Sequence, residues 1–175
     1  MKKQGKNKKY KFEEYKPEYK ERFKKEKERI KRALTEAKIE HVGSTAVPGL
    51  GGKGIIDIAI LASKEKLAKY LEKLEDMGYE YKSKPEDDER KFLQRIHEED
   101  GEERRNHIHL TSDDEEWKLM LALRDYLREN EEARDKYGEI KREAIEKNKE
   151  RQDYRDHKEE FVKKLAKKAL DWKKK

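Results

Sequence analysis

One carboxylate interrupts an otherwise apolar run. Asp57 lies within residues 55–61, where every other residue is Ile, Ala or Leu. A short, continuous apolar run of this kind predicts a strand that is covered on both faces. An ionised carboxylate is costly to bury unless a cation or a metal ion neutralises it. Asp57 therefore either pairs with a buried Arg or caps a neighbouring loop, or it binds a metal such as Mg²⁺.

A glycine-rich segment directly precedes this strand. Residues 43–54 contain five of the nine glycines of the chain, together with Pro48. In Gly43-Ser44 and the glycines that follow, backbone N–H groups can converge on an anion without obstruction by side chains. Glycines also build ordinary turns, so the loop by itself is ambiguous. Next to Asp57, it predicts a phosphate cradle beside a carboxylate that can hold Mg²⁺.

Two histidines one residue apart form a second candidate group. In a strand, His107 and His109 point to the same face. They either form a solvated sheet face or supply a metal ligand or a general base. Two histidines do not complete a metal site, so Asp57 and His109 together are the candidate ligands. Arg95 and His97 share one face of the preceding strand, which allows a cluster across the hairpin.

Two cations lie on apolar stripes of predicted helices. Arg124 falls on the stripe that runs from Trp117 to Leu127, and Lys158 on the stripe that runs from Tyr154 to Trp172. Long cationic side chains can reach solvent from such positions. Alternatively, two inward cations near a phosphate loop indicate an anionic ligand.

The elements that must position these residues follow from periodicity and from turn residues. Ser63 is expected to cap a helix that stops at Gly78, and Asp100-Gly101 is a hairpin turn signal. This order of elements predicts an α+β or mixed α/β fold with one sheet. The expected elements are helices over 17–37, 63–77, 114–128, 132–148 and 153–172, strands over 37–42, 55–61, 79–82, 91–97 and 106–111, and an acidic loop over 85–89.

The composition narrows the class of protein. Of 175 residues, half are charged and 32% are hydrophobic, and there is no Cys. The absence of Cys excludes disulfides and thiolate metal sites. No stretch is long and apolar enough to span a membrane, and the N-terminus does not resemble a signal peptide. Abundant Lys and Glu are typical of a heat-adapted protein, for which we expect a cytoplasmic location.

The net charge of +6 is concentrated at the ends of the chain. Five lysines lie within residues 1–9 and three more are residues 173–175, which leaves −2 for the sequence between them. We expect residues 1–9 to be a disordered basic tail that aids solubility or weakly attracts anions. Binding of nucleic acid by these tails is a further hypothesis, whereas no membrane partner is expected.

One long block resembles the GrpB family of the nucleotidyltransferase superfamily, a family that also occurs fused to dephospho-CoA kinase. The block is IEHVGSTAVPGL at residues 39–50, followed by Lys53 and the strand that contains Asp57. One departure is Gly54, where the family usually has Pro. The resemblance extends over nearly the whole chain from about Tyr15. Further matching positions are Phe92, Arg95, 107–109, Trp117, 124–128, Tyr137, Lys141, Tyr154, Lys158 and Phe161.

The resemblance implies a nucleotidyltransferase-like mixed sheet within one domain over residues 10–175. This α+β fold has an N-terminal helix, one crossover helix and a C-terminal helical segment. The Gly-Ser turn would lie under nucleotide phosphates. In the superfamily, two carboxylates one residue apart bind the Mg²⁺ ions that align a nucleoside triphosphate. Asp57 occupies the first of these positions and Ala59 the second, which weakens the case for two-metal catalysis.

Two functions are therefore compared. In the first, the protein binds a nucleotide or another phosphate ester with Mg²⁺ and transfers it to an unknown acceptor, with Asp57, His107 and His109 as catalytic residues. In the second, it is a nucleotide- or anion-binding module that has lost catalysis together with the second carboxylate. The residues expected to contact phosphate or ligand are Gly43, Ser44, Thr45, Lys53, Arg95, Arg124, Tyr154 and Lys158.

Overall fold

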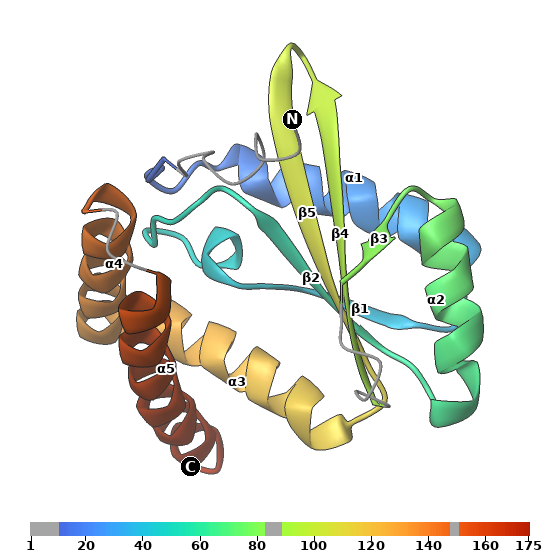
Figure 1. The fold of residues 1–175 in the computed structure, drawn as a ribbon. Coiled ribbons are helices and arrows are strands. Elements are labelled where there is room, and N and C mark those ends of the chain that lie inside the picture. The colour runs from blue at the N-terminus through green and yellow to red at the C-terminus, as the bar shows by residue number, and fades with distance from the viewer. Residues whose placement is uncertain (1–10, 83–88, 148–150) are drawn as a thin grey trace.

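A five-stranded mixed sheet forms the centre of the computed structural model, with helices on both faces (Figure 1). The structure describes residues 11–82, 89–147 and 151–175, without the side chains of 151–159. The predicted α+β fold is confirmed. The elements are α1 (Glu18–Ala33), β1 (Lys38–Val42), η2 (Ser44–Ala46), β2 (Ile56–Leu61), η3 (Lys64–Lys66), α2 (Leu67–Asp76), β3 (Glu80–Tyr81), β4 (Arg90–Glu99), β5 (Glu102–Thr111), α3 (Asp114–Glu129), α4 (Glu131–Glu146) and α5 (Arg151–Lys173).

The strand order is β1-β2-β5-β4-β3. Strands β2 and β5 pair in parallel, and the other neighbours are antiparallel. In this register Asp57 lies opposite His107, and Ala59 lies opposite His109. Because side chains alternate between the faces of a strand, all four point to the same face of the sheet.

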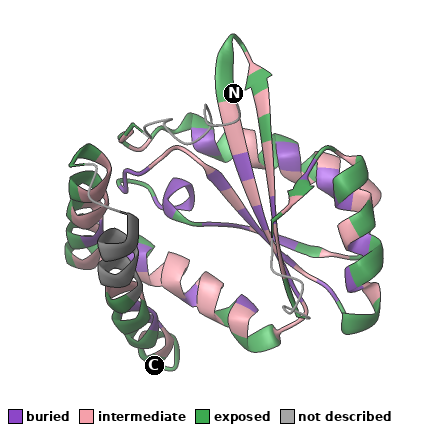
Figure 2. Ribbon diagram, viewed as in Figure 1, coloured by how far each residue is buried: buried purple, intermediate pink, exposed green. Residues whose placement is uncertain are grey.

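Helices α1 and α2 cover the opposite face. Ile56, Ile58 and Ile60 of β2 are fully buried there, together with residues from both helices. Buried residues accordingly follow the central strands and the inner sides of these helices (Figure 2). Strand β2 is thus covered on both faces of the sheet, as its continuous apolar run predicts.

Helix α3 covers the face that carries Asp57, but only in part. Trp117 of α3 packs with Val42 and Ala59 in a small apolar cluster. Helices α4 and α5 lie beyond α3, where Val47 and Leu50 of the glycine-rich segment pack with apolar residues of these three helices. The ends of the segment are therefore held by strands β1 and β2, and its middle is held by the C-terminal helices.

The β4–β5 hairpin projects beyond the other strands (Figure 1). Its turn consists of Asp100 and Gly101, whose φ angles are 54° and 77°. Positive φ at both positions is the requirement of a two-residue turn of type I′. The hairpin predicted from this dipeptide is confirmed, with Glu99 paired to Glu102.

Several predicted boundaries are corrected. The first helix ends at Ala33 rather than at residue 37, because the chain turns after Leu34 to enter β1. Ser63 makes no side-chain capping bond, since a 3₁₀ turn over Lys64–Lys66 separates it from α2. The expected basic tail at 1–9 and most of the acidic loop at 85–89 lie outside the described residues. Within the described part of the chain, none of the helices has the length and apolar character needed to cross a bilayer.

Candidate functional site

Asp57 and the two histidines meet on the α3 face of the sheet. His109 Nε2 lies 3.2 Å from Asp57 Oδ1, and His107 Nδ1 lies 3.6 Å from the same oxygen. The Phe92 ring of β4 packs against both imidazoles, with centroid distances of 4.9 Å and 5.4 Å. Parallel pairing of β2 and β5 produces this arrangement, because it places these residues at adjacent positions of one face.

The carboxylate is held in its ionised form. Burial would raise the pKa of Asp57, but hydrogen bonds and positive charge from His107 and His109 outweigh this and hold it well below its usual range. Of the alternatives left open by the sequence, pairing with a buried Arg does not apply within the described residues, where the hydrogen-bonding partners of Asp57 are imidazoles. His107 Nε2 and His109 Nδ1 are buried and have no hydrogen-bond partner among the described residues.

Gly43 brings the glycine-rich segment against this carboxylate. Its φ of 78° and ψ of −174° lie in a region that only glycine adopts readily. A Cβ added at Gly43 would lie 2.4 Å from Asp57 Oδ2, so any side chain would collide with the carboxylate. The turn η2 begins at the next residue, Ser44, which is buried. Gly43 therefore allows the start of the turn to touch Asp57.

Thr45 and Ser44 have different surroundings. The Thr45 hydroxyl donates to Ile55 O at 2.9 Å and lies 2.9 Å from His41 Nε2. It therefore links the end of the glycine-rich segment to strand β1. Ser44 faces Gly52, where an added Cβ would lie 2.6 Å from Ser44 Oγ. Thr45, predicted as a phosphate contact, thus has its hydroxyl engaged inside the protein.

Lys141 of α4 is a site residue that sequence reasoning placed only among the family matches. A Cβ added at Gly52 would lie 3.7 Å from Lys141 Nζ, which puts this cation beside Ser44. Its ammonium lies 4.7 Å from the centre of the Tyr137 ring. Burial lowers the pKa of Lys141 to about 8, while the charge of Asp57 acts in the opposite direction. The spacing of four between Tyr137 and Lys141 is the only sequence signal for this contact.

Arg124 points inward, as its position on the apolar stripe predicts, but it binds protein groups. Its guanidinium lies 2.9 Å from both Glu40 and Asp125 and donates to His41 O at 3.1 Å. Burial by itself would lower the pKa of Arg124. The hydrogen bonds and charges of the two carboxylates outweigh this effect, so the pKa is raised above its ordinary value. Arg124 therefore ties α3 to β1, which corrects the expectation of a cation left for a ligand.

Arg95 does not join the site. It pairs with Asn106 in the antiparallel register and so lies on the α1 face, opposite His107. The expected cluster of Arg95 and His97 with the histidine pair is therefore corrected. Lys53 is half-buried between Gly52 and Gly54, and its role stays a prediction. The side chains of Tyr154 and Lys158 on α5 lie outside the described residues.

The position of the second superfamily carboxylate is filled by apolar packing. Ala59 is fully buried and contacts the cluster of Val42 and Trp117. Among the residues that the structure describes, no group of three or more His, Cys, Asp or Glu side chains is placed to hold a metal ion. Among the described residues, Asp57 is the carboxylate that contacts both histidines.

Solved structures with the same fold include that of the Cid1 poly(U) polymerase with MgGTP bound. The TM-score is 0.54 at 16% sequence identity, over 75% of this chain and 44% of that one. At this identity the similarity establishes the fold alone, which is that of a nucleotidyltransferase. The GrpB protein from Enterococcus faecalis is much more similar. Its crystal structure matches with a TM-score of 0.77 and 32% identity, over 94% of this chain and 99% of that one.

Curated relatives agree with this similarity. The UPF0157 protein BH1888 of Halalkalibacterium halodurans is 34% identical over 161 residues, which is 89% of this chain and 80% of that protein. The UPF0157 protein YqkA of Bacillus subtilis is 28% identical over 165 residues, and the chain spans 47% of its length. A family described as GrpB protein matches residues 9–168. Because this match covers nearly the whole sequence, the chain belongs to the GrpB family.

Proposed function

We propose that this protein binds a nucleotide or a related phosphate ester, together with Mg²⁺, on the α3 face of the sheet and transfers part of it to an acceptor. The observation that carries the proposal is the meeting of three elements at Asp57. The carboxylate contacts Gly43 at the start of the turn and both histidines of β5. A backbone turn, a carboxylate and two imidazoles are groups that phosphate transfer uses.

Asp57 suits Mg²⁺ as one ligand among several. Mg²⁺ prefers oxygen and is commonly held by one or two carboxylates, with phosphates and water completing the shell. Asp57 provides a carboxylate whose low pKa keeps it charged, with His109 as a second candidate ligand. When bound, the ion would neutralise negative charge on the phosphates. Phosphate oxygens of the substrate and water would provide the remaining ligands.

The remaining groups fit the needs of transfer. In a nucleotidyl transfer, an acceptor oxygen forms a bond to the α-phosphorus, the bond to pyrophosphate breaks, and the acceptor hydroxyl loses its proton. His107, whose side chain is 19% exposed beside Asp57, is suited to take that proton. Lys141 beside Ser44 is suited to neutralise phosphate charge.

The packing of Ala59 favours a second candidate function, binding without catalysis. A carboxylate at this position would be buried against Trp117 and Val42, so the surroundings as well as the residue have diverged from a two-metal site. In this case the ligand binds without turnover. The acceptor and the nucleobase are open in both cases.

Binding is tested by measuring the melting temperature with each nucleoside triphosphate, with and without Mg²⁺. We expect stabilisation by at least one nucleotide, and a loss of at least tenfold in affinity in Asp57→Asn. Asp76→Asn is the matched control, because Asp76 is an exposed residue at the end of α2. If no nucleotide changes the melting temperature, the proposal is wrong.

Catalysis is tested separately with nucleotides labelled at the α-phosphate and a broad set of acceptors. Transfer of label by the wild type, abolished in Asp57→Asn and reduced in His107→Gln, supports the enzyme. Binding that persists without any transfer supports the second candidate. Binding that is independent of Mg²⁺ would contradict the role of Asp57 as a metal ligand.

A further inference from the structure

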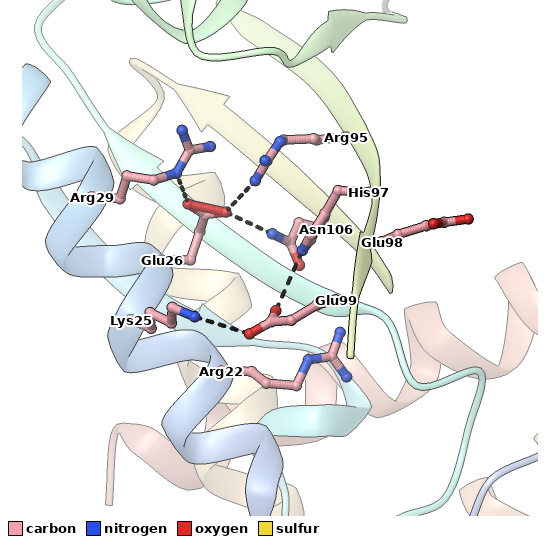
Figure 3. Close-up of a pocket in the computed structure, with 9 residues that line it drawn as sticks. All are labelled: Arg22, Lys25, Glu26, Arg29, Arg95, His97, Glu98, Glu99 and Asn106. Carbon is pink, nitrogen blue, oxygen red and sulfur yellow. Dashed lines mark hydrogen bonds and ion pairs between the residues drawn. The ribbon is translucent and has the colours of Figure 1, made fainter. Parts of the chain in front are cut away.

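A polar cavity lies on the face of the sheet opposite to Asp57. It occupies about 300 Å³ between α1 and the β4–β5 hairpin (Figure 3). Its walls come from three elements, since α1 contributes one side and the two strands contribute the floor. The lining residues are Arg22, Lys25, Glu26, Arg29, Arg95, His97, Glu98, Glu99 and Asn106.

The buried acid of this cavity, Glu26, is fully engaged. It is 7% exposed and accepts hydrogen bonds from Arg29 at 2.5 Å, from Asn106 at 2.8 Å and from Arg95 at 3.3 Å. Tyr79 donates to it as well, at 3.1 Å. Two guanidinium groups share this one carboxylate, so the cluster has a net positive charge.

Two further acids, Glu98 and Glu99, line the edge of the cavity. Glu99 accepts from Lys25 at 2.9 Å and lies 3.7 Å from His97 Nε2. Glu98 is exposed and points away from the other lining residues (Figure 3). Neither carboxylate therefore reaches the guanidinium of Arg22, for which no bond is drawn in this view.

Three buried nitrogens in or next to the cavity have no hydrogen-bond partner among the described residues. They are Arg22 Nη2, His97 Nδ1 and Arg104 Nε. His97 and Arg104 face each other across the hairpin, and Arg22 comes from α1. Burial, and next the charge of Arg104, lower the pKa of Arg22, so two guanidinium groups are close enough to repel each other. This charge is partly offset, because Arg104 pairs with Glu102 at 3.0 Å and lies 3.9 Å from Glu18, whose charge also acts on Arg22. The three buried nitrogens themselves are groups that a bound anion would supply with a hydrogen-bond partner.

We propose that this cavity binds a compact phosphate-bearing anion at Arg22 and His97, which line it, with Arg104 next to Arg22. The three residues come from a helix and two strands, so their nitrogens approach from different directions, which suits a tetrahedral oxyanion better than a planar carboxylate. Guanidinium groups bind phosphate through paired, charge-assisted hydrogen bonds. The site is separate from the one at Asp57, because the sheet lies between them.

Inorganic phosphate is the probe for this site. Amide NMR spectra of the full chain, titrated with phosphate at about 150 mM salt to suppress weak surface binding, should show saturable shifts in α1 and in the β4–β5 hairpin. Arg22→Gln should weaken binding at least tenfold. Arg32→Gln makes the same change at an exposed position of the same helix and should alter it less than twofold. Succinate should bind at least tenfold more weakly than phosphate.

Two further variants keep the test decisive. Arg22→Lys keeps the positive charge but loses the paired N–H donors of the guanidinium, so it should lose part of the affinity for phosphate. This variant provides a test even if Arg22→Gln does not fold. Asp57→Asn should leave the shifts in α1 unchanged, so failure at one site is distinguishable from failure at the other. Equal binding by Arg22→Gln and wild type would overturn the proposal, and equal affinity for succinate would overturn the choice of phosphate.

Discussion

A decrease in pH from 7 to 5 is expected to destabilise the fold through one buried histidine. His41 is 6% exposed, and its ring stacks on Phe23 with a centroid distance of 4.5 Å. The single hydroxyl proton of Thr45 goes to Ile55 O, so His41 Nε2 is the donor to Thr45. Burial lowers the pKa of His41 from 6.5 to about 4.

The magnitude follows from linkage between protonation and folding. Between pH 6.5 and 4 the unfolded chain binds a proton at His41 that the folded chain does not, so stability falls as pH falls. Above pH 6.5 the full contribution is present. It is lost progressively as the pH falls toward 4, by about 2 kcal/mol at pH 5 and by about 3 kcal/mol in total.

The assay is denaturant unfolding of wild type and His41→Gln, each at pH 7 and pH 5. Gln can still donate to Thr45 but does not titrate, so each variant serves as its own reference. The wild type should lose about 2 kcal/mol more than the variant between the two pH values. Equal losses would refute the reasoning, as would an NMR titration that finds the pKa of His41 near 6.5 in the folded protein.

Three substitutions test other parts of the structure. Gly43→Ala should lower the free energy of unfolding by about 2 kcal/mol and abolish nucleotide binding, because it combines a strained φ with a collision at Asp57; unchanged unfolding and binding would contradict this. Ala59→Asp should lower the free energy of unfolding by about 3 kcal/mol and should not increase transfer of label above that of the wild type, since it buries a charge against Trp117. Glu26→Gln should also cost about 3 kcal/mol, measured by urea unfolding, since it leaves two guanidinium groups without their carboxylate.

The approach of Asp57 to the histidine pair could be predicted from the sequence in part. The period of two places His107 and His109 on one face, and an apolar strand with a single carboxylate needs a partner for it. The parallel register that brings the two strands together is a tertiary property. Periodicity does not contain it, so the approach of the two strands stayed open until the structure placed them.

The misplacement of Arg95 could have been avoided. A two-residue turn at Asp100-Gly101 pairs residue 99 with 102, and the same count pairs Arg95 with Asn106. The face of Arg95 therefore follows from the turn that the sequence already predicts. The partner of Arg124 could not be found in this way, because Glu40 is far away in the chain and only the packing of α3 on β1 brings them together.

The short turn of the hairpin has a consequence for how this family can change in length. Strands β4 and β5 are a wall shared by two polar sites, since Arg95 and Asn106 face one cavity while Gln94 and His107 face the other side. Insertion of one residue within either strand would exchange the two sets of side chains and damage both sites at once. Relatives that keep both sites should therefore differ in these strands by even numbers of residues, or only at the turn.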